Sequence, residues 1–233
     1  MSESWINISA ADGGTFAAFL AKPQAGIGPG IVLIQEIFGV NKVMRDIAID
    51  LSRLGYVVAC PDLFWRQEPR VDITDQTDAE WKKAFDLFKG FDQDKGVQDL
   101  DATLATLRAM DDCTGKVGAV GYCLGGKLAY SMATRTSIDC SVGYYGVGIE
   151  AALDEADQIK KPLMLHIAEK DKFVPPDAQE KIKAKLSGYP MVTLHSYPGM
   201  DHAFARVGGA HYDVENAALA NTRTTDFFAN HLK

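Results

Sequence analysis

A glycine-rich turn at residues 121–126, with the sequence GYCLGG, constrains the fold of this chain more than any other stretch. Residues 116–120 before it are small and mostly apolar and predict a buried strand, and residues 127–133 after it carry apolar side chains at helical spacing. Glycines at positions 121 and 125 would let the chain close sharply and let the helix approach the strand. The pattern predicts a strand–turn–helix unit with the thiol of Cys123 at its tip, which is the layout of a nucleophile elbow.

The turn allows two interpretations of Cys123. It could be a small buried cysteine in a connecting turn, or it could be a reactive thiol, because free N–H groups and the dipole at a helix N-terminus favour a thiolate. The turn alone leaves both open, and residues at other strand ends decide between them.

Apolar runs alternate with amphipathic stretches along the rest of the chain. The pattern predicts strands at 5–8, 15–21, 31–34, 56–60, 141–145, 163–167 and 192–197, and helices at 41–51, 79–88, 94–110, 177–186 and 214–228, the first capped by Asn41. The first two strands, joined by the turn sequence ADGG, predict an antiparallel hairpin. The later alternation predicts an α/β fold with a mostly parallel sheet and helices on both faces. We expect residues 1–233 to form a single domain, with residues 64–78 as a long excursion or pocket wall.

Composition and charge exclude several classes of protein. The net charge of −7 and the scattered Lys and Arg residues argue against binding to nucleic acid or to an anionic membrane. The N-terminal sequence MSESW lacks the features of a signal peptide, and no apolar run is long enough to span a bilayer. The cysteines lack zinc spacing and are expected to be free thiols in a reducing cytoplasm: Cys60, Cys113, Cys123 and Cys140. We expect a cytoplasmic protein without a metal site.

Two further candidates for catalysis follow strands near the C-terminus. Asp171 comes shortly after the strand at 163–167, and His202 follows the strand at 192–197. Functional loops of a parallel sheet gather at the carboxyl ends of its strands. The order Cys123, Asp171, His202 is the order nucleophile, acid, histidine of the α/β-hydrolase fold. In these roles the thiol attacks a carbonyl carbon, His202 transfers protons, and Asp171 holds the imidazole.

Each of these residues also has a structural alternative. Asp171 alone could be a turn residue, and His202 alone could be a helix cap or a surface histidine. His166, inside an apolar strand, is expected to be a core residue, and three histidines lack a strand-end position: His195, His211 and His231. The conjunction of the elbow with two partners in the right order favours the catalytic interpretation.

An acyl-transfer site also needs donors for the developing oxyanion. The backbone N–H of Leu124, directly after the nucleophile, is one expected donor, and the N–H of Ile37, after the strand at 31–34, is the other. Glu36, beside it, is either a solvated loop glutamate or a partner of the Cys123 thiol.

Five motifs carry a resemblance to a known family: QEIFGVN at 35–41, CPDL at 60–63, VGYCLGG at 120–126, GYYGVG at 143–148 and DHAFAR at 201–206. Through them the sequence resembles the dienelactone hydrolase family along nearly the whole chain. The resemblance implies a monomeric enzyme without a cofactor that hydrolyses an unsaturated, carboxylate-bearing lactone to maleylacetate during the breakdown of chloroaromatic compounds. It implies that Glu36 helps to activate Cys123 and that Arg206 binds the substrate carboxylate, as suits a guanidinium. Phe38 and Tyr145, inside two of the motifs, are expected to contact the substrate.

The sequence departs from the family pattern at two positions. A second carboxylate-binding arginine is replaced by Trp81, and Lys82 and Lys83 would point elsewhere on a helix. The residue after the histidine is often serine in the family, and here it is Ala203. We expect a shift towards less polar esters or lactones.

Other functions use the same residues. A thioesterase or acyl-transfer enzyme would share the triad and differ only in the acyl acceptor. A binding module that kept the fold is disfavoured because all three triad members are present. A redox role for Cys123 is disfavoured because no second cysteine is adjacent in the sequence.

Overall fold

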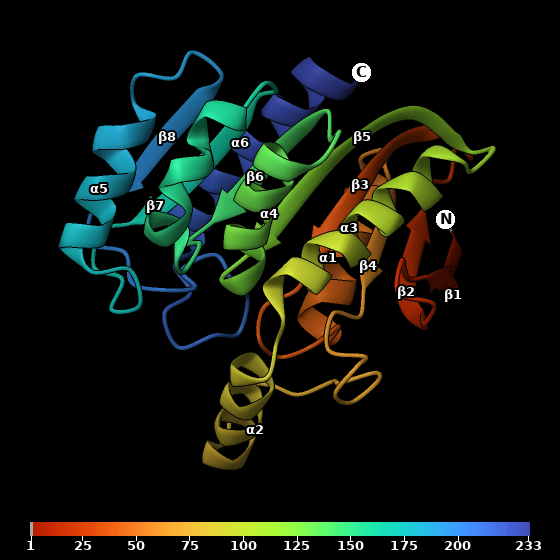
Figure 1. The fold of residues 1–233 in the computed structure, drawn as a ribbon, viewed down its shortest axis with the longest axis horizontal. Helices are drawn as coiled ribbons and strands as arrows, with labels where there is room; N and C mark the ends of the chain where they lie inside the picture. Colours follow the sequence, from red (N-terminus) through yellow and green to blue (C-terminus); the bar gives the residue numbers. More distant parts are fainter. Residues whose placement is uncertain (1) are drawn as a thin grey trace. The chain divides into compact units, whose positions relative to one another are not determined.

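The computed structural model describes residues 2–233, so Met1 of the expected domain lies outside it. The chain forms two compact units, the first ending at Gly118 and the second beginning at Ala119, and the expectation of a single domain stays a prediction. The described residues form eight strands (Figure 1): β1 Ser2–Ser9, β2 Thr15–Lys22, β3 Gly28–Ile34, β4 Val57–Pro61, β5 Cys113–Tyr122, β6 Cys140–Tyr144, β7 Leu163–Ala168 and β8 Val192–Tyr197. The helices are α1 Lys42–Arg53, α2 Asp78–Lys89, α3 Gln93–Arg108, α4 Leu124–Arg135, the 3₁₀ segment η1 Ile149–Gln158, α5 Pro176–Leu186 and α6 Val214–Leu232.

The first unit begins with the expected antiparallel hairpin. β1 pairs with β2 from Ser2 opposite Lys22 to Ser9 opposite Thr15. β2 is antiparallel to β4, and β3 is parallel to β4, which gives the strand order β1-β2-β4-β3. Every residue of β3 is buried, as the apolar run at 31–34 predicts for a central strand.

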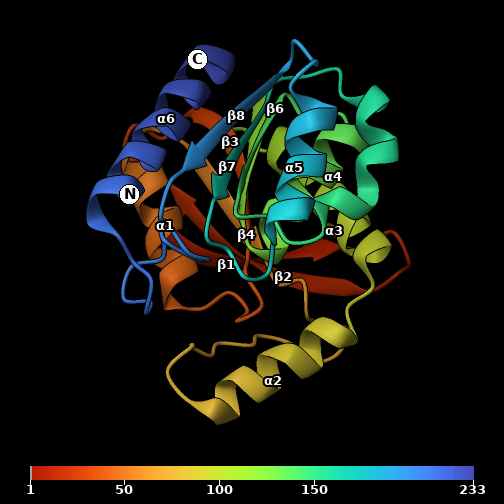
Figure 2. The ribbon, with the colours of Figure 1, turned by 90° about the vertical axis from the view of Figure 1, so that its left-hand side faces the viewer.

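The helices of the first unit differ in how they relate to these strands. The side chain of Asn41 caps α1, because its Oδ1 accepts a hydrogen bond from the Met44 N–H at 3.1 Å. α2 stands apart from the strands of this unit in both ribbon views (Figures 1 and 2). The expected excursion leads into it, and Thr77 caps its first turn.

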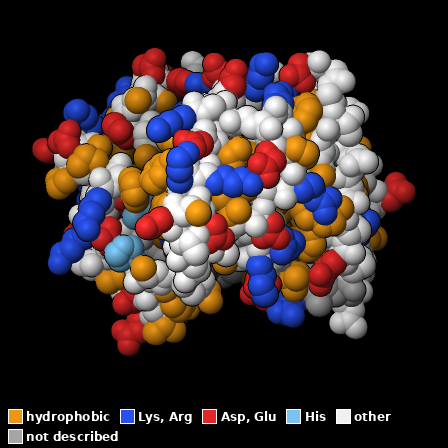
Figure 3. All heavy atoms as spheres, turned by 90° about the horizontal axis from the view of Figure 1, so that it is seen from below, with side chains coloured by type: hydrophobic (Ala, Val, Ile, Leu, Met, Phe, Trp, Pro, Cys, Tyr) orange, Lys and Arg blue, Asp and Glu red, His pale blue; other side chains and the backbone are white. Residues whose placement is uncertain are grey.

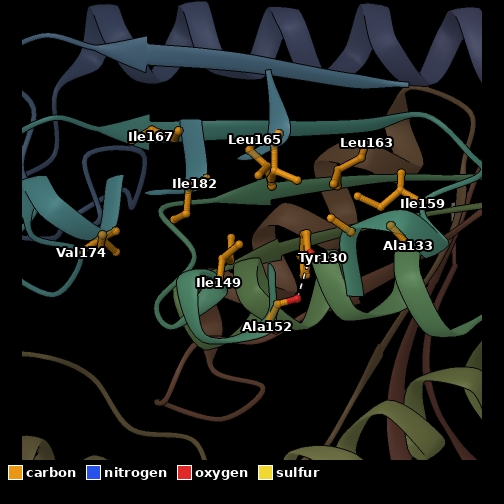
Figure 4. Packing of buried hydrophobic residues seen from close by; sticks show 13 residues of the cluster. Tyr130, Ala133, Ile149, Ala152, Ile159, Leu163, Leu165, Ile167, Val174 and Ile182 are labelled. Carbon is orange, nitrogen blue, oxygen red and sulfur yellow. Dashed lines mark hydrogen bonds between the residues drawn. The ribbon is translucent and has the colours of Figure 1, made fainter. Parts of the chain in front are cut away.

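In the second unit the strand order is β5-β6-β7-β8, and β5 enters it from the first unit. β6 and β7 are parallel, as are β7 and β8, which confirms the α/β alternation. Apolar side chains of α4, η1, α5 and β7 form a buried cluster (Figure 4). Within it the hydroxyl of Tyr130 donates to the carbonyl of Ala152 at 3.0 Å. The segment η1 was not predicted; it follows Gly148, whose φ of 90° turns the chain.

Charged side chains of both signs are interspersed on the face drawn in Figure 3, so that face offers no extended area of one charge. Of the helices described, none is both long and apolar enough to cross a membrane.

Candidate active site

The turn between β5 and α4 has the geometry of a strained nucleophile elbow. Cys123 precedes the first residue of α4 and has φ 56° and ψ −114°, a conformation that is costly for a side-chain-bearing residue. Its N–H donates to the Tyr144 carbonyl at 3.1 Å. A Cβ at Gly121 would lie 2.0 Å from the Gly125 carbonyl oxygen, and one at Gly126 would lie 2.4 Å from the Tyr144 carbonyl oxygen. These two glycines therefore permit the close packing that holds Cys123 at the tip.

The helix that follows supplies backbone donors next to the thiol. Leu124 is the first residue of α4, where N–H groups have no acceptor within the helix. The Gly126 N–H instead donates to the Cys123 carbonyl at 3.0 Å, which tightens the turn. A negative charge beside this helix start is favoured by the N–H groups and by the helix dipole.

Asp171 is both a turn residue and a partner of His202. Its Oδ1 accepts hydrogen bonds from the N–H groups of Phe173 at 2.8 Å and Val174 at 3.3 Å. Its Oδ2 lies 2.7 Å from His202 Nδ1, and its side chain is buried. The turn fixes one carboxylate oxygen, so the other is held towards the imidazole.

His202 joins the acid to the thiol. It lies on the loop after β8, is 6% exposed, and hydrogen-bonds the side chain of Cys123 as well as Asp171. Burial by itself would lower the pKa of His202, but the neighbouring Cys123 and the hydrogen-bonded Asp171 raise that pKa to about 10. The structure thus brings Cys123, Asp171 and His202 together, in an arrangement that stabilises the imidazolium form of His202.

Two aromatic rings flank the imidazole of His202. Tyr145, a sequence candidate for substrate contact, packs edge-on with a centroid distance of 5.1 Å and has a positive φ of 37°. Phe173 packs edge-on from another side at 4.8 Å and is 45% exposed. Sequence reasoning missed Phe173, and its position two residues after Asp171 is the signal that could have found it.

Arg206 lies on the loop that carries His202. Its side chain is buried, and its N–H donates to the Ala203 carbonyl at 2.9 Å, so the loop turns back between these residues. Ala203 has a positive φ of 63° and is fully buried. A strained, packed turn therefore connects His202 to the arginine.

The other candidates belong to the first unit. Glu36 is 3% exposed, so its interpretation as a solvated loop glutamate is wrong. Ile37 and Phe38 are buried beside it. Phe38 packs edge-on against Trp81 at 5.0 Å, and the indole N–H of Trp81 donates to the Asp75 carbonyl at 3.0 Å.

The lysines next to Trp81 are engaged on the surface of the first unit. Lys82 pairs with Asp86 and Lys83 with Glu68, each at 2.6 Å. Their ammonium groups are thus held by carboxylates of the same unit, in line with the expectation that they point elsewhere. Among residues 2–233, no group of three or more His, Cys, Asp or Glu side chains is placed to hold a metal ion.

Known proteins resemble this chain over almost its full length. The model of the dienelactone hydrolase family matches residues 16–232. A protein from Azospirillum brasilense is 51% identical over 229 residues, covering 97% of this chain and 98% of its own. A carboxymethylenebutenolidase from Pseudomonas putida is 40% identical over 224 residues, covering 96% of this chain and 95% of its own.

Solved structures share the fold. A protein from Klebsiella pneumoniae has a TM-score of 0.83 at 24% identity and covers 98% of this chain and 99% of its own. A dienelactone hydrolase from Anabaena variabilis has a TM-score of 0.74 at 16% identity, and the match covers 100% of this chain and 99% of its own. The predicted α/β-hydrolase fold is confirmed.

Proposed function

The chain belongs to the dienelactone hydrolase family and is a hydrolase of lactone or ester bonds, and we propose that it opens dienelactone to maleylacetate with a triad of Cys123, His202 and Asp171. One observation carries the proposal: a continuous series of hydrogen bonds runs from Asp171 Oδ2 through His202 to the side chain of Cys123. The acid fixes the imidazole by its Nδ1, which leaves Nε2 for the thiol.

In the first half of the reaction, Cys123 Sγ attacks the lactone carbonyl carbon while its proton resides on His202. The tetrahedral intermediate collapses to a thioester, the ring C–O bond breaks, and the leaving enol oxygen takes the proton from His202 Nε2.

In the second half, His202 Nε2 removes a proton from water and the resulting hydroxide attacks the thioester. The C–S bond breaks, the carboxylic acid leaves, and Cys123 recovers the proton held by His202. Ketonisation of the released enol gives maleylacetate.

The remaining candidates support this reaction in separate roles. The N–H groups of Leu124 and Ile37 would stabilise the oxyanion. Arg206 would bind the substrate carboxylate through a bidentate contact, and Glu36 would assist the activation of Cys123. The substrate is a small molecule, and the enzyme acts as a monomer without a cofactor.

A second candidate function is hydrolysis of a broader, less polar range of esters or lactones, and the surroundings of Trp81 favour it. Its N–H is satisfied by the Asp75 carbonyl, and its ring packs against Phe38 and stacks on Phe85. The side chain therefore offers apolar surface where the family has a guanidinium, and uncharged esters or lactones lose less by that exchange.

The test compares hydrolysis of cis-dienelactone and p-nitrophenyl acetate by the wild type, Cys123→Ala and Cys113→Ala. We expect Cys123→Ala to lose hydrolysis of both substrates. Cys113 is a partly exposed cysteine outside the proposed triad, so Cys113→Ala should keep hydrolysis of both. Full activity of Cys123→Ala would overturn the triad.

The substrate range is tested with Trp81→Arg. If Trp81 lowers the use of a carboxylate, the arginine variant gains cis-dienelactone activity relative to p-nitrophenyl acetate. An unchanged ratio, together with strong wild-type preference for dienelactone, would rule out the less polar substrate range.

A further inference from the structure

A second histidine of the same unit lies in a polar cluster that the proposed mechanism does not use. His166, on β7, is 1% exposed. Its Nδ1 lies 2.7 Å from the Tyr197 hydroxyl, and its Nε2 lies 3.0 Å from Thr224 Oγ1. Both ring nitrogens are therefore engaged with hydroxyl groups, one from β8 and one from α6.

The cluster continues beyond these hydroxyls in both directions. Arg223 Nη1 donates to the Tyr197 hydroxyl at 3.1 Å. Thr224 Oγ1 lies 2.6 Å from the Tyr144 hydroxyl, which donates to Asn221 Oδ1 at 3.0 Å. The result is a chain in the order Arg223, Tyr197, His166, Thr224, Tyr144 and Asn221.

The hydrogen bond from the Tyr144 hydroxyl to Asn221 Oδ1 sets the direction of this hydrogen-bond chain. Tyr144 gives its only hydroxyl hydrogen to Asn221, so Thr224 must donate to Tyr144. Thr224 then accepts from His166 Nε2–H, and His166 Nδ1 accepts from Tyr197. Tyr197 in turn accepts from Arg223. The three hydroxyl hydrogens and the imidazole hydrogen of this series are each used once, and His166 is held as the neutral Nε2–H tautomer.

The backbone of Tyr144 and of His166 connects this hydrogen-bond chain to the candidate site. The Tyr144 carbonyl accepts from the Cys123 N–H at 3.1 Å, and its ring stacks on Tyr122 with a centroid distance of 4.6 Å. The His166 carbonyl accepts from the N–H of Tyr145 at 2.8 Å, and Tyr145 packs against the imidazole of His202.

Tyr197 makes the third connection. Its carbonyl accepts from the N–H groups of Glu169 at 3.2 Å and Met200 at 3.3 Å, which belong to the loops that carry Asp171 and His202. Its ring packs at 4.7 Å on Phe204, two residues after His202. Each of the three strand residues in the chain thus holds one part of the site.

We propose that this hydrogen-bond chain is a positioning network that sets the relative placement of the loops carrying Cys123, Asp171 and His202. The inference rests on the proposed function, because positioning has a kinetic meaning only if these three residues act together. The four inner members of the network are buried and hydrogen-bonded: Tyr144, His166, Tyr197 and Thr224. Such a network adopts one arrangement, and losing a single inner member leaves its buried neighbour without a partner.

The first experiment measures kcat and KM of Tyr197→Phe, Thr224→Val and Thr224→Ser with p-nitrophenyl acetate. We expect kcat to fall by about ten-fold or more for the first two, because small misplacements of reacting groups are costly, while KM stays within about two-fold. Thr224→Ser keeps the hydroxyl and should stay within about two-fold of the wild type. If Tyr197→Phe does not fold, the Thr224 pair decides.

Two matched controls separate positioning from stability. Tyr130→Phe removes a buried phenolic hydroxyl that donates to the Ala152 carbonyl outside the chain, and Ser141→Ala removes a buried hydroxyl on β6. We expect both to keep kcat, even where the melting temperature of Tyr130→Phe falls as much as that of Tyr197→Phe. An equal loss of kcat in Tyr130→Phe would overturn the proposal.

The second experiment needs no substrate. Nitrogen-15 NMR of labelled histidine should show His166 as the Nε2–H tautomer, unchanged from pH 6 to 9, and Thr224→Val should shift its Nε2 resonance. An Nδ1–H tautomer would overturn the directed chain. If Cys123→Ala keeps full activity while His166 shows the expected tautomer, the proposed function has failed, but the directed hydrogen-bond chain around His166 is supported. If Cys123→Ala is inactive and Tyr197→Phe has full kcat, the positioning role has failed.

Discussion

The surroundings of His202 and of His166 pose opposite conditions for the same side chain. Both imidazoles are almost fully buried in the second unit. His202 contacts a carboxylate and a thiol, and its pKa is raised to about 10. His166 contacts two hydroxyls, and burial, together with the charges of His195 and Arg223, lowers its pKa well below the usual value.

The difference shows that burial alone does not decide the charge of a histidine. Desolvation disfavours the imidazolium at both positions, and only at His202 do partners that can carry negative charge outweigh it. One imidazole can therefore exchange protons with a nucleophile, while the other keeps one tautomer and serves as a fixed connector.

Asp171→Asn makes the surroundings of His202 more like those of His166, because it removes the carboxylate. Of the substitutions compared here, it should have the largest effect, a fall in kcat. The amide supplies no negative charge and can favour the wrong tautomer, so we expect kcat to fall by about 10³-fold. NMR titration should show a lower pKa for His202. Asp177→Asn, an exposed carboxylate at the start of α5, is the control and should stay within about two-fold. Unchanged kcat in Asp171→Asn would contradict the role of the acid.

His166→Gln sharpens the comparison through stability. A folded-state pKa below the unfolded value means that the unfolded chain binds more protons below about pH 6.5, so acid destabilises the fold. We expect urea unfolding between pH 7.5 and 5 to show that the free energy of unfolding falls as the pH is lowered. Below about pH 6.5 the wild type should lose up to about 1.4 kcal/mol more per pH unit than the variant. His195, whose pKa is also lowered, contributes to both proteins. Equal slopes would mean that His166 titrates normally.

Phe173→Leu tests the ring that covers His202 and should have the smallest effect. Leucine keeps apolar cover but loses the edge-on contact, worth about 0.5–1.5 kcal/mol for aromatic pairs, so we expect kcat/KM to fall by about three-fold. Steady-state kinetics with both substrates checks this. A loss above about 100-fold would assign Phe173 more than a covering role.

Local signals made the elbow and the order of the candidate residues predictable. Glycines around Cys123 mark a sharp turn, and the apolar runs before Asp171 and His202 mark strands whose ends meet in a parallel sheet. These signals lie within a few residues of each candidate, so the sequence contains them without knowledge of packing.

The polar chain around His166 was not predictable in the same way. Its members lie on β6, β7, β8 and α6, and only tertiary packing brings them together. Sequence reasoning placed His166 in the core, which the structure confirms, but periodicity does not say which hydroxyl reaches an imidazole. Whether Glu36 at the end of an apolar strand is buried stayed open in the sequence for the same reason, because periodicity does not show what packs on a loop residue.

The one-way order of the hydrogen-bond chain restricts how this sequence can evolve. Loss of one hydroxyl, as at Tyr197 or Thr224, leaves a buried donor or acceptor without a hydrogen-bond partner and is expected to be harmful by itself. Replacing adjoining members together by apolar residues of similar shape leaves no such orphan and can be nearly neutral. Substitutions at these positions should therefore be strongly epistatic, with a fitness valley between the polar and the apolar versions of the same core.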